Sequence, residues 1–242
     1  MNKISFTIVD YVQGGFSLIF VMVSIVIGLI FIMKYFQYEN LQLLLVGLTW
    51  IGLASPWFPD SINFILVFFT TPLPLRLNLI IGNSFLPVVA IIWVKAFTDL
   101  LYKDKQKILL IIFFIIGIIF EIYFIISLIL APSLIGSFPV SPFQIVYHPV
   151  FEIFLLVFIL VFMITGILFG KESLKSEDKE INLKGKFLII AFISFAIGAI
   201  LDSIIPREAY LVIITRLILI SASLEFYFGF MPPEWLKNFF IK

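Results

Sequence analysis

The chain has 242 residues, of which 62% are hydrophobic and only 13% are charged. Soluble domains are typically about 45–50% apolar, and a mean hydropathy of +1.18 points instead to a membrane protein that crosses the bilayer several times. A net charge of +1 excludes electrostatic capture of nucleic acid as a principal role. The chain has no cysteine, which excludes disulfides and thiolate metal ligands.

Seven segments are long and apolar enough to span a bilayer, since a helix needs roughly 20 apolar residues to cross a ~30 Å hydrocarbon core. Backbone groups in lipid must be bonded within their own segment, and these segments lack the alternation of barrel strands, so helices are expected. The predicted fold is a single all-α integral-membrane domain over residues 1–242, multi-pass in the cell membrane. The predicted helices are 13–35, 41–58, 77–101, 108–131, 149–170, 187–205 and 208–231.

One further apolar segment, 61–74, is too short to span. Its 14 residues would reach about 21 Å as a helix, and the segment ends in Pro72 and Pro74. A short re-entrant or interfacial helix is therefore expected between the second and third spans, covering the outer mouth of the bundle. If this segment did span, there would be eight helices and the N-terminus would lie inside.

Lysines in short loops predict the orientation. With seven helices, Lys34 lies on the same side of the membrane as the ten lysines that follow the third, fifth and seventh predicted helices. Only Lys3, Arg76 and Arg207 remain on the other side. The positive-inside rule then places the N-terminus outside and the C-terminus in the cytoplasm. The ten lysines that follow the third, fifth and seventh predicted helices are Lys103, Lys105, Lys107, Lys171, Lys175, Lys179, Lys184, Lys186, Lys237 and Lys242. The charged segment 171–186 is expected to be a solvated loop. Trp57 and Trp235 are expected at the membrane interfaces.

Four predicted helices carry an ionisable residue in their outer halves. Such side chains are costly in lipid and usually face the bundle interior or water. A polar cluster that opens outward is therefore expected between the fourth, fifth, sixth and seventh helices. Its members are Glu121, Glu152, Asp202, Arg216 and His148, the only histidine, which immediately precedes the fifth helix.

The direction of Asp202 is predicted by its neighbours. Ser194, Gly198 and Asp202 recur every four residues and therefore share one helix face. A stripe of small residues usually packs against another membrane helix, so Asp202 is expected to point inward.

Three interpretations of the cluster stay open. Arg216 paired with one carboxylate could serve only to fix the register of the helices, the cluster could bind a ligand or an ion, or the charged side chains could face lipid and snorkel to the interface. Glu152 and His148 also lie near the headgroups, where ordinary interface residues are found.

Three smaller features lie elsewhere. Lys95 and Asp99, four residues apart near the inner end of the third helix, predict a local ion pair. Glu225 lies on the face of the last helix opposite Arg216 and is expected to pair with Lys95 across the inner leaflet. Asn83 and Pro87 form an i, i+4 pair that predicts a kink in the third helix.

Several functions lack the residues they need. The chain contains no G-x-S-x-G, HExxH or phosphate-binding glycine loop. A metal-dependent hydrolase needs several converging ligands, and one histidine at a helix edge does not supply them. A retinal protein needs a lysine in its last helix, which is absent here. We expect no enzymatic activity, no cofactor and no metal.

Two short pieces resemble the seven-helix sensor region at the N-terminus of many prokaryotic histidine kinases. The first is Gly82-Asn83-Ser84-Phe85-Leu86-Pro87 with Trp93, and the second is the exit segment Phe228-Gly229-Phe230-Met231-Pro232-Pro233-Glu234-Trp235-Leu236. The resemblance implies a prokaryotic sensory module. The sequence ends at Lys242 without a kinase, PAS or cyclase domain, so a signal is expected to pass to a separate cytoplasmic protein.

Three functions remain as hypotheses. The first is a receptor-like sensory module that binds a small or lipid-like ligand in an outward cavity and signals to a cytoplasmic partner. The second is a small-molecule or proton-coupled transporter, in which Glu121 or Asp202 would change protonation; carriers of this size often act as homodimers and show internal repeats, and no repeat is found here. The third is an accessory subunit of a membrane complex. The expected partners are the lipid bilayer and such proteins. No nucleic-acid partner is expected.

Overall fold

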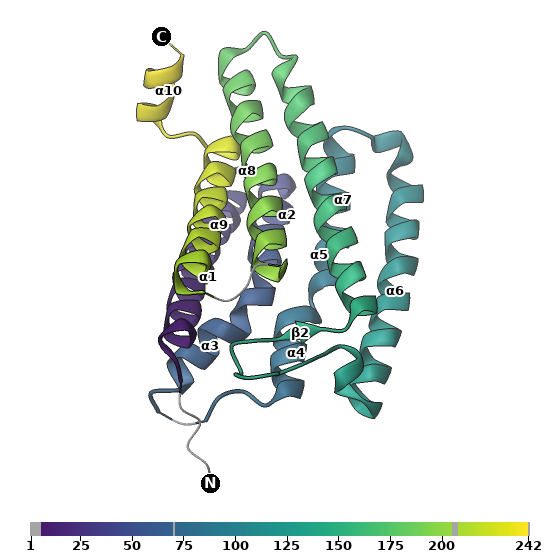
Figure 1. Ribbon diagram of the computed structural model, residues 1–242. Coiled ribbons are helices and arrows are strands. Elements are labelled where there is room, and N and C mark those ends of the chain that lie inside the picture. The colour runs from purple at the N-terminus through teal and green to yellow at the C-terminus, as the bar shows by residue number, and fades with distance from the viewer. Residues whose placement is uncertain (1–5, 70, 205–207, 242) are drawn as a thin grey trace.

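Seven helical segments of the computed structural model are long and apolar enough to cross a membrane (Figure 1). This agrees with the all-α membrane architecture expected from the sequence. The structure describes residues 6–69, 71–204 and 208–241, so Lys3, Thr70, Arg207 and Lys242 lie outside the described residues. The segments are α1 (Ile8–Tyr38), α2 with α3 (Leu41–Leu53 and Phe58–Leu66), α4 with α5 (Leu75–Asn83 and Leu86–Leu100), α6 (Gln106–Leu130), α7 (Pro149–Leu174), α8 (Lys179–Ile204) and α9 (Ala209–Phe230).

The second span is longer than predicted, and a separate helix over 61–74 is not confirmed, because residues 61–66 belong to α3. α2 ends at Leu53, a 3-10 turn follows at Ser55–Trp57, and α3 then continues to Leu66. Pro56 and Pro59 each stand in the first turn of a new helical piece, where the missing N–H costs nothing. The prolines therefore bend this span without ending it, and Leu41–Leu66 forms one candidate span.

The third span breaks where Asn83 and Pro87 led us to expect a kink. α4 ends at Asn83 and α5 begins at Leu86, with Pro87 in its first turn. The Asn83 amide donates to the carbonyl oxygen of Leu79 at 3.1 Å, and the Tyr147 hydroxyl donates to the Asn83 side-chain oxygen at 3.4 Å. At the break, the Asn83 side chain is thus hydrogen-bonded to Tyr147, which lies outside this span.

Two predicted boundaries are displaced because charged residues cap helices. α1 begins at Ile8 rather than residue 13, since Thr7 and Asp10 form a reciprocal capping box. α8 begins at Lys179 rather than residue 187, and the side chain of Asp178 accepts hydrogen bonds from the N–H groups of Glu180 and Ile181. Part of the segment expected to be a solvated loop is therefore the first turns of α8.

The two ends of the bundle differ in character (Figure 1). One end, here the hairpin end, carries the two-stranded antiparallel ribbon of β1 (Gly136–Ser137) and β2 (Val146–Tyr147), in which Gly136 pairs with Tyr147. The opposite, lysine-rich end carries the α5–α6 and α7–α8 connections and the short helix α10 (Glu234–Phe240). The loops that predicted the orientation therefore share one end of the molecule.

An aromatic core fills the bundle between α1, α2, α8 and α9. Trp50 stacks on Phe226 with ring centroids 3.9 Å apart, and Phe31 and Phe192 meet Phe226 edge to face. All four side chains have at most 1% of their surface exposed. Aromatic side chains bury large apolar areas and prefer such offset or edge-on contacts, so this core fixes the relative positions of the four helices.

Glycines bring neighbouring spans into backbone contact. A Cβ added to Gly185 of α8 would lie 2.7 Å from the carbonyl oxygen of Gly170 of α7, and one added to Gly170 would lie 2.9 Å from that of Gly185. Gly28 of α1 and Gly47 of α2 show the same reciprocal relation, at 2.9 and 2.7 Å. Small residues allow membrane helices to pack this closely.

We predict that Gly185→Ala lowers the free energy of unfolding by about 1–3 kcal/mol, the usual cost of overpacking. Thermal unfolding of the purified protein in detergent measures the effect. Gly15→Ala on α1 is the matched control, because its Cβ would make only ordinary contact with the Phe64 ring at 3.5 Å. Equal losses in the two variants would contradict the close crossing.

Candidate functional site

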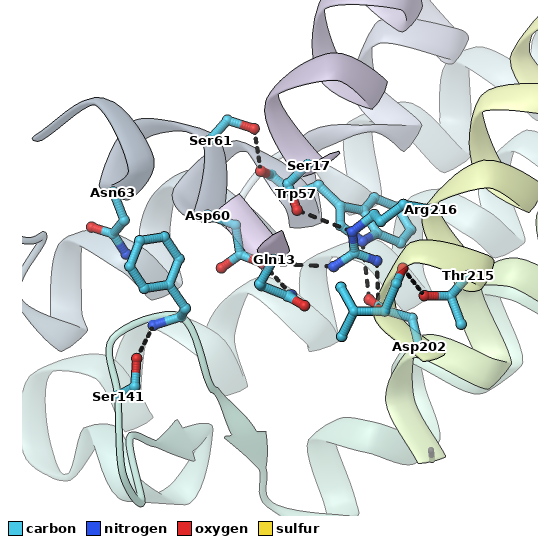
Figure 2. A network of polar contacts seen from close by, with 12 residues as sticks. Gln13, Ser17, Trp57, Asp60, Ser61, Asn63, Ser141, Asp202, Thr215 and Arg216 are labelled. Atoms are coloured by element: carbon cyan, nitrogen blue, oxygen red, sulfur yellow. Dashed lines mark hydrogen bonds and ion pairs between the residues drawn. The ribbon is translucent and has the colours of Figure 1, made fainter. Parts of the chain in front are cut away.

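Arg216 of α9 is the centre of a buried polar network. Its side chain has no exposed surface, and its Nη1 lies 2.5 Å from Oδ1 of Asp202 on α8. Nη2 lies 3.7 Å from Oδ2 of Asp60 on α3, and Nε donates to the Ser17 hydroxyl of α1 at 3.0 Å. Figure 2 shows the guanidinium pointing between the two carboxylates. One side chain thus joins four helices.

Trp57 and Gln13 complete the network. The Trp57 indole N–H donates to Oδ2 of Asp202 at 3.0 Å, so the two oxygens of this carboxylate are shared between an indole and a guanidinium. The Trp57 ring also lies 5.8 Å from the guanidinium carbon, within range of a cation–π interaction. The Gln13 amide donates to Asp60 at 2.6 Å.

The loop of the β1–β2 ribbon is tied to the helices at the hairpin end. The Ser141 hydroxyl donates to Oδ1 of Asp10 at 2.5 Å. The amides of Asn63 and Asn78 both donate to the carbonyl oxygen of Pro142, at 3.0 and 3.4 Å. α1, α3 and α4 therefore all hold this loop.

A cavity of about 360 Å³ lies beside the network. Its wall is formed by α1, α2, the segment around Trp57, Asn78 of α4, Leu86 of α5, α7, α8 and residues 144–147. The ionisable side chains among its described lining are Asp60, Glu152, Asp202 and the Tyr147 phenol. The prediction that 61–74 covers the mouth is not confirmed: no described residue of that segment belongs to the lining, and residues 144–147 of the hairpin supply part of the wall.

The predicted polar cluster is only partly assembled. Asp202 and Arg216 form an ion pair, and Glu152 lines the same cavity as Asp202. Glu121 is separate: it lies on α6, which packs against α5, and it forms no hydrogen bond or ion pair with another described residue. Both residues were expected in the outer halves of their helices, but depth in the membrane does not reveal which helices are neighbours.

His148 has a structural role at the start of α7. Its side-chain Nδ1 accepts a hydrogen bond from the Val150 N–H at 3.4 Å, and its backbone N–H donates to the carbonyl oxygen of Ile135 at 2.8 Å. It therefore caps the helix and joins it to the ribbon. It is not part of the cavity wall described above.

The ion pair between Lys95 and Asp99 was predicted correctly, but the expected contact of Glu225 with Lys95 was not. Lys95 pairs with Asp99, which also accepts hydrogen bonds from Gln42 and Gln106. Glu225 does not form an ion pair with Lys95. It accepts instead from Ser221, one turn earlier on the same helix, at 2.5 Å.

The sequence did not reveal four members of the network around Arg216 and Asp202. Asp60, Trp57, Gln13 and Ser17 lie near the ends of the predicted spans or in apolar stretches, where a single polar residue carries little signal. Trp57 was expected at a membrane interface but has only 6% of its surface exposed. The one usable signal was Asp60 itself, an acidic residue flanked by apolar segments on both sides.

Within the described ranges, no three His, Asp or Glu side chains come close enough to hold a metal ion. Comparison of the chain with family models, curated proteins and solved structures found no match. The function is therefore argued from the site itself.

We predict that Asp202→Asn destabilises the protein by about 3–5 kcal/mol, because it leaves the buried charge of Arg216 without its closest partner. Arg216→Met combined with Asp202→Asn should cost less than the sum of the two single changes, since no lone charge then remains buried. Thermal unfolding in detergent gives all three values.

Glu121→Gln supplies the control for this cycle. It also neutralises an acidic residue within a span, but Glu121 makes no contact with Arg216, so its effect should add to that of Arg216→Met. Additive losses for Arg216 and Asp202 would contradict the network.

Proposed function

We propose that this protein is a receptor-like sensory module that binds a small ligand in the cavity at the hairpin end. The observation that carries this proposal is that two cavity-wall carboxylates, Asp60 and Asp202, are also the ion-pair partners of a fully buried arginine. A ligand that contacts either carboxylate acts directly on the contacts that hold α9 against α3 and α8.

The contacts of Arg216 are suited to change. Its two terminal nitrogens are shared unequally between two carboxylates: Nη1 lies 2.5 Å from Asp202 and Nη2 lies 3.7 Å from Asp60. A small movement of either carboxylate therefore shifts the balance between the two ion pairs. Bistable packing of this kind can amplify a small displacement into a helix shift of about 1–2 Å.

α9 connects the network to the lysine-rich end. Beyond Phe230 the chain forms α10, where the Lys237 ammonium lies 2.9 Å from Glu234 and 3.2 Å from Glu180 of α8. These contacts, first that to Glu234 and then that to Glu180, raise the pKa of Lys237 and keep it charged. A movement of α9 against α8 therefore reaches a charged contact on the side proposed to be cytoplasmic, where a signalling partner would respond.

A receptor fits this interior better than a carrier does. Phe226 lies ten residues beyond Arg216 on α9, about 15 Å along the helix axis, and belongs to the tightly packed aromatic core. A carrier must open its site to the second side, which would require this core to separate. The weak resemblance to histidine kinase sensor regions supports the same choice.

The proposed orientation is N-terminus outside and lysine-rich end inside, because basic residues in short loops favour the cytoplasm. The hairpin end and the cavity then face outward.

This orientation predicts thiol labelling in intact cells, for which a chain without cysteine is well suited. Val140→Cys, in the exposed hairpin loop, should react with an impermeant maleimide. Glu177→Cys, exposed between α7 and α8, should react only after permeabilisation. The reverse pattern would overturn the orientation.

The sensory role predicts that changes at the cavity move the lysine-rich end. Spin labels on cysteines at Asp104 and Asn238, both exposed, report the distance between the α5–α6 connection and α10. Ala199→Phe, which fills part of the cavity wall, and Asp202→Asn should each shift this distance by about 1–2 Å.

Ile190→Phe is the matched control, because Ile190 lies on the exposed face of the same helix as Ala199. It should leave the distance unchanged. Identical distances in all variants would contradict a sensory role and favour an accessory subunit.

A further inference from the structure

The described lining of the cavity is acidic. Asp60, Glu152 and Asp202 all belong to it, and no lysine, arginine or histidine does. Arg216 behind the wall is an ion-pair partner of Asp60 and Asp202 but not of Glu152.

Among these three carboxylates, Glu152 is the one without a side-chain partner among the described residues. Its side chain lines the cavity, is partly buried, and makes no hydrogen bond or ion pair with another described residue. A carboxylate drawn partly out of water is stabilised by a cation brought next to it. Glu152 is therefore the natural contact for a positive group in the cavity.

The rest of the wall favours an organic cation over a metal ion. The carboxylates do not form a group that could hold a metal, as described above. Trp57, Phe158 and Phe195 contribute aromatic surface to the same wall. Aromatic faces attract ammonium groups and also pack against apolar groups. A volume of about 360 Å³ is at the small end of ligand pockets.

We propose that the cavity binds a small organic cation, with an ammonium group at Glu152 and an apolar body against the aromatic wall. This inference rests on the proposed ligand-binding function and names the class of ligand. Asp60 and Asp202 line the same cavity, so a cation bound there competes with Arg216 for them. This competition is the step that couples binding to movement of α9.

The ammonium group has two possible sources, a free amine or the headgroup of an amino lipid such as phosphatidylethanolamine. Both share the chemistry that Glu152 would recognise. Neutral maltoside micelles, which contain no ammonium group, allow each source to be added separately.

The test uses the full chain in such micelles and three matched probes of nearly equal size: 4-phenylbutylamine, 4-phenylbutanol and 4-phenylbutyrate. Binding is measured by calorimetry and by the shift in thermal unfolding. The amine should bind and stabilise the protein, and the neutral alcohol and the anion should bind at least about 10-fold more weakly, the equivalent of one charge-assisted hydrogen bond.

Variants then assign the contact. Glu152→Gln should weaken binding of the amine by about 10- to 100-fold without affecting the alcohol. Glu121→Gln is the matched control, a glutamate within a span but away from the cavity, and should leave binding unchanged. Short-chain phosphatidylethanolamine added to the micelles should displace the amine if the headgroup is the natural ligand, and fail to do so if a free amine is.

Each outcome separates this inference from the proposed function. Equal binding of alcohol and amine, or an amine affinity that is insensitive to Glu152→Gln, overturns the cation inference but leaves a ligand cavity in place. No binding of any probe also overturns it. Binding of the amine without a change in the Asp104–Asn238 distance supports the cation site but contradicts the sensory role.

Discussion

The burial of Arg216 is the constraint on which the hairpin half of the bundle depends. A guanidinium without exposed surface must be compensated, because a charge withdrawn from water without a partner costs several kcal/mol. The compensation comes from helices far apart in the sequence: Ser17 of α1, Asp60 of α3 and Asp202 of α8. Their convergence, together with the aromatic core, fixes how α9 sits among its neighbours.

The same constraint explains why a cavity lies at this level. Side chains that must reach Arg216 cannot also fill the space between α2, α7 and α8, and their carboxylates leave one side of the wall polar. On the lysine-rich side of Arg216 the interior contains no such requirement, and Trp50, Phe192 and Phe226 pack it tightly. The bundle thus has a polar, open half and an aromatic, closed half. In the proposed function, the open half receives the ligand and the closed half passes on movement.

The candidate site was predictable only in part, and the reason differs from residue to residue. Asp202 could be placed inward because Gly198 and Ser194 mark the packing face of its own helix. Glu121 was grouped with Arg216 because both lie at similar depth, but depth does not reveal which helices are adjacent. Asp60 was missed as a partner because the prolines around it resembled a loop. They instead open new helical turns, which carry Asp60 into the bundle.

The amino-acid sequence by itself determined the class of protein, the number of spans and the loops that carry the positive charge. These follow from local properties: about 20 apolar residues cross a bilayer whatever their neighbours are, and lysines mark a loop without reference to the fold. Only the tertiary structure decided which carboxylates meet Arg216, that Glu152 faces a cavity while Glu121 does not, and that the β1–β2 loop supplies part of its wall. Those features depend on the lateral order of the helices, which is set by close contacts such as Gly170 with Gly185 and by the pairing of charges between distant segments. Neither leaves a periodic signal along the chain.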